Sequence, residues 1–225
     1  MSRGRLYRVA GVALVVGGAL GVVAGLLAPS GGSVKDVVAS RLFYPAATGT
    51  VVAGVLTMVS WPALYARQHR ESGWLGFGGF VLVMTGGLLL AVAVPTFQLL
   101  AVPWLASLPV SEARLEQGPA AFGIFFPVVG LVLTAGGVLF GLGSLRARVF
   151  SRPFAVGFMG AAVLSLVFGF LSLPGPFNSL GQVVISLALG WAGCELLRRL
   201  DEAPSPTPAP GGRGQQETPA SPATV

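Results

Sequence analysis

Long apolar blocks separated by short polar segments make up most of the chain. The blocks cover residues 9–28, 44–66, 74–100, 120–143, 154–173 and 180–197. Each is close to the ~20 residues that an α-helix needs to cross about 30 Å of hydrocarbon. Because a bilayer offers the backbone no water to pair with, segments of this length are expected to be helical. The pattern predicts an all-α, polytopic membrane helix bundle with six transmembrane helices.

Composition supports this class of protein. Of the 225 residues, 53% are hydrophobic and only 10% are charged, whereas a soluble domain usually carries about 25% charged residues. The net charge of +6 could indicate a nucleic-acid partner, but the charges lie in short loops and form no basic stripe with interleaved aromatic residues. Membrane lipids are therefore the expected partner, and nucleic acid is not.

The basic residues are divided unequally between the two sides of the predicted bundle. Eleven fall on one side, namely Arg3, Arg5, Arg8, Arg67, Arg70, Arg146, Arg148, Arg152, Arg198, Arg199 and Arg213. The other side holds Lys35, Arg41 and Arg114. Since cytoplasmic loops are enriched in Lys and Arg, both ends of the chain are predicted to be cytoplasmic. Trp61 and other Trp and Tyr residues near the span ends are assigned to the membrane interface.

Three regions follow from this topology. Residues 1–8 form a cytoplasmic N-terminus, and residues 9–200 form the transmembrane domain. Residues 201–225 are rich in Pro and almost lack large apolar side chains. Such a segment cannot bury enough surface to offset the entropy of ordering, so a disordered cytoplasmic tail is predicted.

Small residues recur at intervals of four in two of the predicted spans. Gly17, Gly21 and Gly25 form a GxxxGxxxG ladder, and Gly137 with Gly141 forms a second GxxxG pair. Such faces let two helices approach closely, so these five residues are predicted to be helix-packing positions. The partner helix could belong to the same bundle or to a second copy in a homodimer.

Ionisable residues are absent from the middle of every predicted span. Intramembrane charges usually mark proton relays and ion sites, so carboxylate-based ion coupling is not expected. Glu195 comes nearest, close to the inner end of the last span. Its spacing from Arg198 and Arg199 predicts an ordinary ion pair between residues three or four apart on one helix.

Three amides are candidates for ligand binding. Gln98, Asn178 and Gln182 all map near the outer face, where they could line a small polar pocket. The Ser and Thr residues within the spans carry less weight, because hydroxyls in membrane helices mostly bond to their own backbone.

Few residues suggest catalysis or metal binding. Asp36, Glu112 and Glu116 could converge on the outer side as an acid–base group, although a solvated acidic loop is the favoured explanation. The single histidine, His69, and the single cysteine, Cys194, have no metal-ligand spacing around them. No catalytic residue, metal or cofactor is therefore assigned.

Two stretches carry a resemblance to other proteins. PALYARQHRESGWLGFGGFVLVMTGGLLLAVAVPTFQLLAVPWLA at 62–106 and LFGLGSLRARVFSRPFAVGFMGAAVLSLV at 139–167 resemble a group of bacterial six-span inner-membrane proteins with no established activity. The resemblance implies a bacterial inner (plasma) membrane location and supplies no functional residues.

Three functional hypotheses remain open. The leading one is a non-enzymatic accessory or assembly protein that packs against membrane partners. The first alternative is a small-molecule or lipid carrier, whose two halves could be related through GVALVVGGAL at 11–20 and GLVLTAGGVL at 130–139. The second alternative is a membrane-embedded enzyme that uses the outer carboxylates.

Overall fold

The computed structural model describes residues 3–109, 111, 113, 115, 119–171 and 179–201. The elements are α1 Arg3–Leu27, α2 Val34–Ala39, α3 Phe43–Gly87, the π-helix η1 Leu88–Ala93, α4 Val94–Ser107, α6 Phe122–Ala147, α7 Arg152–Leu171 and α8 Leu180–Asp201. Within the described residues, five continuous helical stretches are long and apolar enough to cross a membrane. The predicted tail lies outside them. The all-helical membrane bundle agrees with the prediction.

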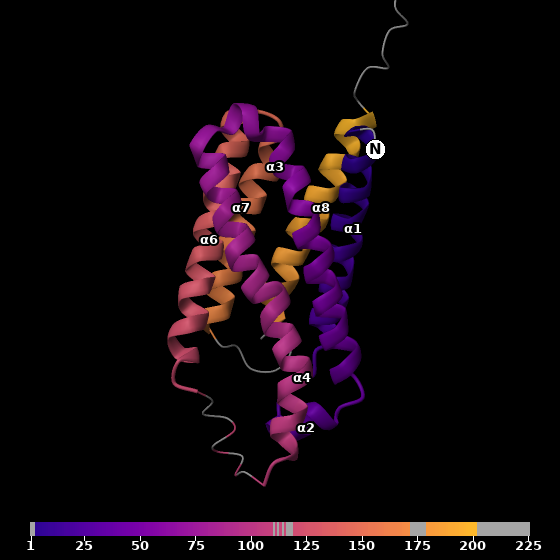
Figure 1. The fold of residues 1–225 in the computed structure, drawn as a ribbon, viewed down its shortest axis with the longest axis vertical. Helices are drawn as coiled ribbons and strands as arrows, with labels where there is room; N and C mark the ends of the chain where they lie inside the picture. The colour runs from indigo at the N-terminus through magenta and orange to yellow at the C-terminus, as the bar shows by residue number, and fades with distance from the viewer. Residues whose placement is uncertain are drawn as a thin grey trace, which may run out of the picture.

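One of these five stretches, Phe43–Ser107, contains two predicted spans. Its helical geometry breaks at Gly73, where φ is 57° and ψ is −150°, and Figure 1 shows the chain reversing direction at the turn within α3. A residue without a Cβ adopts such angles at little cost. The expected loop between residues 66 and 74 is instead helical up to this glycine, because its Arg, Gln and Glu residues are good helix formers.

The second irregularity lies just before Pro95. Residues Leu88–Ala93 form a π-helix, and α4 begins at Val94. Proline has no N–H to donate to the carbonyl of Ala91 four residues earlier, so the regular ladder cannot continue through it. Gly54 packs against that same carbonyl, and a Cβ at this position would collide with its oxygen. The π-helix therefore packs directly against the first half of α3.

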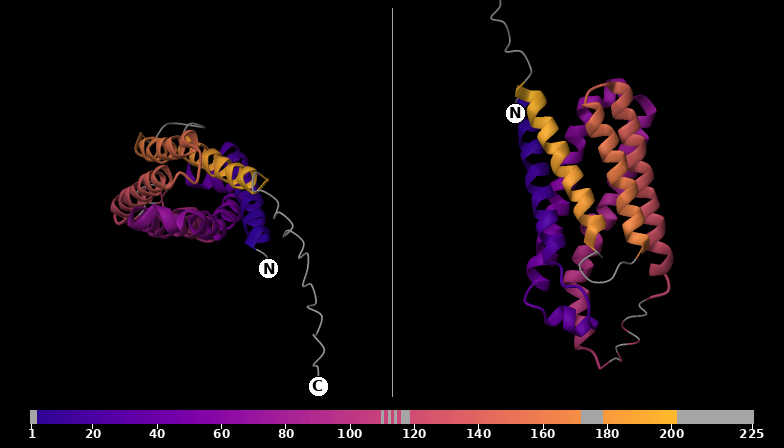
Figure 2. Two further views of the ribbon diagram at one scale, coloured as in Figure 1. Left: turned by 90° about the horizontal axis from the view of Figure 1, so that it is seen from above. Right: turned by 180° about the vertical axis from the view of Figure 1, so that it is seen from behind.

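The long helices close into a ring, which the left view of Figure 2 shows end-on. Glycines mark several of the closest approaches between neighbours: Gly17 to Ala53, Gly18 to Gly190, Gly181 to Ser165, Gly137 to Ala162 and Gly79 to Phe140. The order around the ring is α1, α8, α7, α6, the second half of α3 and the first half of α3. Without a hydrophobic force between helices in lipid, such close backbone contacts provide the packing energy.

The two ends of the ring differ. The start of α1, the turn at Gly73, the connection between α6 and α7 and the end of α8 lie together (Figure 1). These segments carry most of the arginines, so we call this the arginine-rich end. Large apolar side chains such as Val59, Leu100, Ile124 and Leu187 are exposed on the outer surface of the helices. An apolar exterior of this extent is typical of a surface that faces lipid.

Candidate ligand cavity

The interior of the ring holds a partly open cavity of about 860 Å³. Residues from α1, α2, α3, η1, α4, α6, α7 and α8 line it. It extends from Trp61 and Phe158, inside the bundle, to Ala28, Val102 and Ser179 near the helix ends opposite the arginine-rich end. This volume falls within the range of about 300–1,000 Å³ that is usual for small-molecule sites.

No charged side chain is among the described residues that line the cavity. Most of the wall is aliphatic or aromatic, with a small set of hydroxyl and amide groups. A mostly apolar pocket with a few polar groups is the common form of a binding site for an organic molecule.

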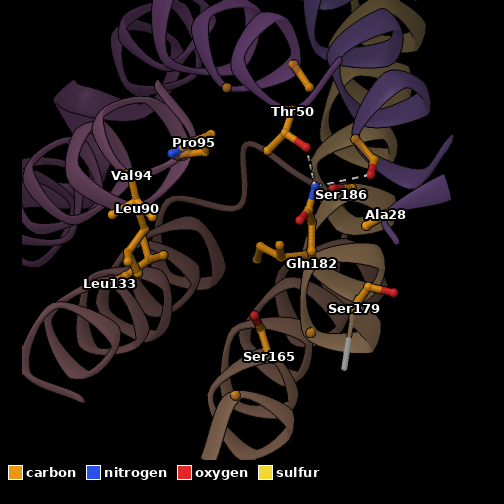
Figure 3. Close-up of a pocket in the computed structure, with 18 of the residues that line it drawn as sticks. Ala28, Thr50, Leu90, Val94, Pro95, Leu133, Ser165, Ser179, Gln182 and Ser186 are labelled. Carbon is orange, nitrogen blue, oxygen red and sulfur yellow. Dashed lines mark hydrogen bonds between the residues drawn. The ribbon is translucent and has the colours of Figure 1, made fainter. Parts of the chain in front are cut away.

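Gln182 is the best-held polar group in this wall. Its Nε2 donates to Thr50 Oγ1 at 3.2 Å and, at the long distance of 3.5 Å, to the carbonyl oxygen of Gly21, as Figure 3 shows. Thr50 Oγ1 in turn donates to the carbonyl of Ala46 at 3.0 Å. The Gln182 carbonyl oxygen has no hydrogen-bond partner among the described residues. The amide is therefore oriented by its nitrogen while its acceptor stays available.

Further polar groups in the wall have no hydrogen bond to any described residue. They are the hydroxyls of Thr57, Ser165 and Ser186 and the indole Nε1 of Trp61. Thr57 is 4% exposed, Ser186 7% and Trp61 1%. Leaving a buried polar group without a partner costs about 1–3 kcal/mol, and such groups are ordinarily paired with protein, water or ligand. The three hydroxyls are suited to hydrogen-bond a guest molecule.

The cavity is closed on the side of the arginine-rich end. Trp61 packs edge-on against Phe140 and Phe158, with ring centroids 4.8 and 5.7 Å apart. Closer to that end, the buried side chains of Gln68 and Ser144 join the first half of α3 to α6. An aromatic layer and a polar layer thus separate the cavity from the arginine-rich end.

Two of the three predicted ligand-binding amides, Gln98 of α4 and Gln182 of α8, line this one cavity, and Asn178 lies outside the described residues. The assignment of Trp61 to the membrane interface is wrong, since α3 continues beyond residue 66 and buries the indole in the core. Thr50 and Ser165 were missed because hydroxyls in helices usually bond their own backbone. Ser165 makes no such bond, and Thr50 also accepts one from Gln182.

The five predicted packing glycines all face helices of the same chain. A Cβ at Gly17 would meet Ala53 and Thr57, one at Gly21 would meet Ser186, and one at Gly25 would meet Val183. On α6, Gly137 faces Ala162, and Gly141 faces Met159 and Ala155. The two small-residue faces are therefore occupied inside the bundle, between α1, α3 and α8 and between α6 and α7.

Glu195 makes the predicted ion pairs, to Arg198 at 3.8 Å and to Arg199 at 3.6 Å. Its Oε1 also accepts the backbone N–H of Ser151 at 2.9 Å, just before α7 begins at Arg152. A carboxylate is favourable there because the first N–H groups of a helix lack partners and carry partial positive charge. Glu195 thus ties the end of α8 to the start of α7.

The predicted carboxylate group is only partly described, since Glu112 and Glu116 lie outside the described residues. Asp36 caps α2, where its Oδ2 accepts from the backbone N–H of Ser33 at 3.0 Å and from the Ser33 hydroxyl at 2.9 Å. These bonds hold the pKa of Asp36 below its ordinary value. Among the described residues, no three His, Cys, Asp or Glu side chains gather in a group that could hold a metal ion.

Comparison with known proteins adds no relative. No family model matches the chain, and no curated protein or solved structure matches it. The geometry and chemistry of the cavity are therefore the observations that bear on function.

Proposed function

We propose that the chain crosses a bacterial inner membrane six times, with both ends in the cytoplasm. The stretch Phe43–Ser107 has 65 residues, and at 1.5 Å per residue an unbroken helix would be about 100 Å long, roughly three hydrocarbon thicknesses. The reversal at Gly73 divides it into two segments of about 30 residues each, and each is long enough for one crossing. The clustering of arginines at one end of the ring supports a cytoplasmic orientation for that end.

We propose further that the protein is a carrier that binds a small molecule or lipid inside the ring. The observation that carries this proposal is the cavity of about 860 Å³, apolar and closed toward the arginine-rich end. In the proposed orientation the guest enters from the outer side or the outer leaflet. Release on the other side requires separation of the aromatic layer formed by Trp61, Phe140 and Phe158.

We place this carrier function ahead of an accessory or assembly role. The accessory hypothesis was motivated by the small-residue faces and by the lack of catalytic chemistry, and the five glycines on those faces pack against helices of the same chain. The carrier also has better support than an enzyme, because the Asp36 carboxylate is already bonded to Ser33 as a helix cap.

Filling the cavity tests the carrier proposal. Ser165 points into the cavity (Figure 3), so Ser165→Phe places a ring inside it. Val163, two residues away on α7, is exposed and is not part of the cavity wall. Val163→Phe is therefore a matched control that adds a similar aromatic bulk on the outside.

The measurement is mass spectrometry of small molecules that co-purify with each protein in nanodiscs. We expect the parent protein and Val163→Phe to retain one guest species at about one per chain, and Ser165→Phe to lose it. Uptake of that species into proteoliposomes should then depend on the parent protein. The same bulk-lipid composition in all three preparations would refute the proposal.

A further inference from the structure

We infer that the guest is an uncharged amphipath with an apolar chain and a hydroxyl or amide head group, and that the head binds at Gln182. This inference rests on the proposed carrier function and specifies its substrate class.

The absence of charge in the described wall indicates a neutral guest. No described residue in the wall could pair with an ion, and removing an ion from water costs several kcal/mol unless a partner compensates. A carboxylate, phosphate or quaternary ammonium guest would remain unpaired inside the ring. A neutral guest avoids this cost.

The hydrogen-bonding groups specify the head. Gln182 Oε1 is an acceptor without a partner among the described residues, and its amide is held in place by Thr50. The hydroxyls of Ser165 and Ser186 can both donate and accept. A head group that donates a hydrogen bond to Gln182 Oε1 and accepts one from Ser165 or Ser186 gives a partner to the amide oxygen and to that hydroxyl. Hydroxyls and amides do this, whereas an ether or ketone would leave the Gln182 oxygen unpaired.

The opposite wall specifies the tail. Figure 3 shows Thr50, Ser165, Gln182 and Ser186 on the side of α3, α7 and α8. Across the cavity lie three aliphatic side chains from η1, α4 and α6, namely Leu90, Val94 and Leu133 (Figure 3). A compact polar solute would leave this apolar wall facing water, whereas an alkyl chain would cover it at about 25 cal/mol per Å² of buried apolar surface. The guest is therefore amphipathic.

Three probes with the same chain separate the head-group classes: 1-tetradecanol, tetradecyltrimethylammonium and tetradecyl sulfate. Trp74, Trp104 and Trp191 are replaced by Phe so that Trp61, which lines the cavity, is the only indole. Chain-brominated versions of the probes are then titrated into the protein in nanodiscs while Trp61 fluorescence is recorded. Ser165→Phe in the same background measures quenching that arises from the bilayer alone.

We expect saturable quenching by the alcohol and at least about tenfold weaker quenching by either ion, a factor that corresponds to about 1.4 kcal/mol. Gln182→Leu should weaken alcohol binding about tenfold, as loss of one buried hydrogen bond does. Thr50→Val preserves the shape of the side chain but removes the hydrogen bond that holds the Gln182 amide, so it should weaken alcohol binding severalfold. This second variant keeps the inference testable if Gln182→Leu misfolds. Leu187→Ala, on the exposed side of α8, should change nothing.

The outcomes distinguish this inference from the proposed function. Tighter or equal binding of a charged probe, or unchanged alcohol binding in both Gln182→Leu and Thr50→Val, overturns the head-group assignment and leaves a cavity that binds guests. Failure of all three probes, while Ser165→Phe still loses the co-purified molecule, also overturns the inference alone. If all the probes fail and Ser165→Phe retains the same co-purified small molecules as the parent protein, the inference and the proposed carrier function are both overturned.

Discussion

The hydroxyl of Ser144 donates to Oε1 of Gln68 at 2.6 Å, and both side chains are fully buried. Ser144 Oγ also lies 2.9 Å from the carbonyl oxygen of Phe140 on its own helix. The Gln68 Nε2 has no hydrogen-bond partner among the described residues. This pair joins the first half of α3 to α6 between the cavity and the arginine-rich end, so its strength bears on how firmly the ring is closed there.

Replacing the two members of this pair should have unequal effects. Ser144→Ala leaves the buried oxygen of Gln68 without a partner, and we expect a loss of about 1–2 kcal/mol in the free energy of unfolding. Gln68→Leu removes the unpaired nitrogen together with the acceptor, so its loss should be smaller. The double variant should lose less than the sum of the two. Chemical unfolding in detergent micelles measures all three, and strict additivity would show that the hydrogen bond contributes nothing.

Gly18→Ala should destabilise the packing of α1 against α8. A Cβ at this position would lie 2.6 Å from the backbone nitrogen of Gly190, which cannot move aside without shifting α8. Overpacking of this kind typically costs about 1–3 kcal/mol, which should appear as a lower melting temperature. Gly160→Ala on α7 is the control, since a Cβ there meets nothing within 4 Å. An equal loss in both variants would contradict the role assigned to close packing.

Glu195→Ala should be among the more destabilising single changes. It removes the acceptor of the Ser151 N–H and one ionic partner of Arg199, whose side chain is 30% exposed, so we expect a loss of about 1–3 kcal/mol in the free energy of unfolding. Glu195→Gln keeps an acceptor for Ser151 and should cost less. Arg198→Ala should change stability by less than about 1 kcal/mol, because the Arg198 side chain is 61% exposed. Thermal unfolding of the parent protein and the three variants in one detergent measures these losses. A loss for Arg198→Ala or Glu195→Gln as large as that for Glu195→Ala would contradict the prediction.

Single cysteines introduced into a Cys194→Ser background test the orientation. Ser111 is exposed on the side opposite the arginine-rich end, and Glu71 is exposed beside the turn at Gly73. An impermeant thiol reagent added to intact cells should label the Ser111→Cys variant and should reach the Glu71→Cys variant only after permeabilisation. Ser72 is fully buried and would be a misleading choice. The reverse labelling pattern would invert the proposed topology.

The positions of the membrane helices could be predicted well from local pattern. A bilayer leaves a 20-residue apolar segment few alternatives to a helix, so each predicted span corresponds to a described helical segment. The helix extensions were harder to predict. Because the polar segment 67–72 contains good helix formers, α3 continues to Gly73, and that extension buries Trp61 in the core. Two of the three candidate amides, Gln98 and Gln182, line the same cavity.

Segment length and polarity are enough to specify an all-helical apolar bundle, because membrane insertion depends on these properties of each segment separately. Which helices are neighbours, and what lies between them, depends on how the whole chain packs. Gln182 and Thr50 are 132 positions apart and Gln68 and Ser144 are 76 apart, so no local periodicity links them. The cavity exists because glycines bring some pairs of helices into contact while the ring keeps others apart, and that depends on all the helices packing together.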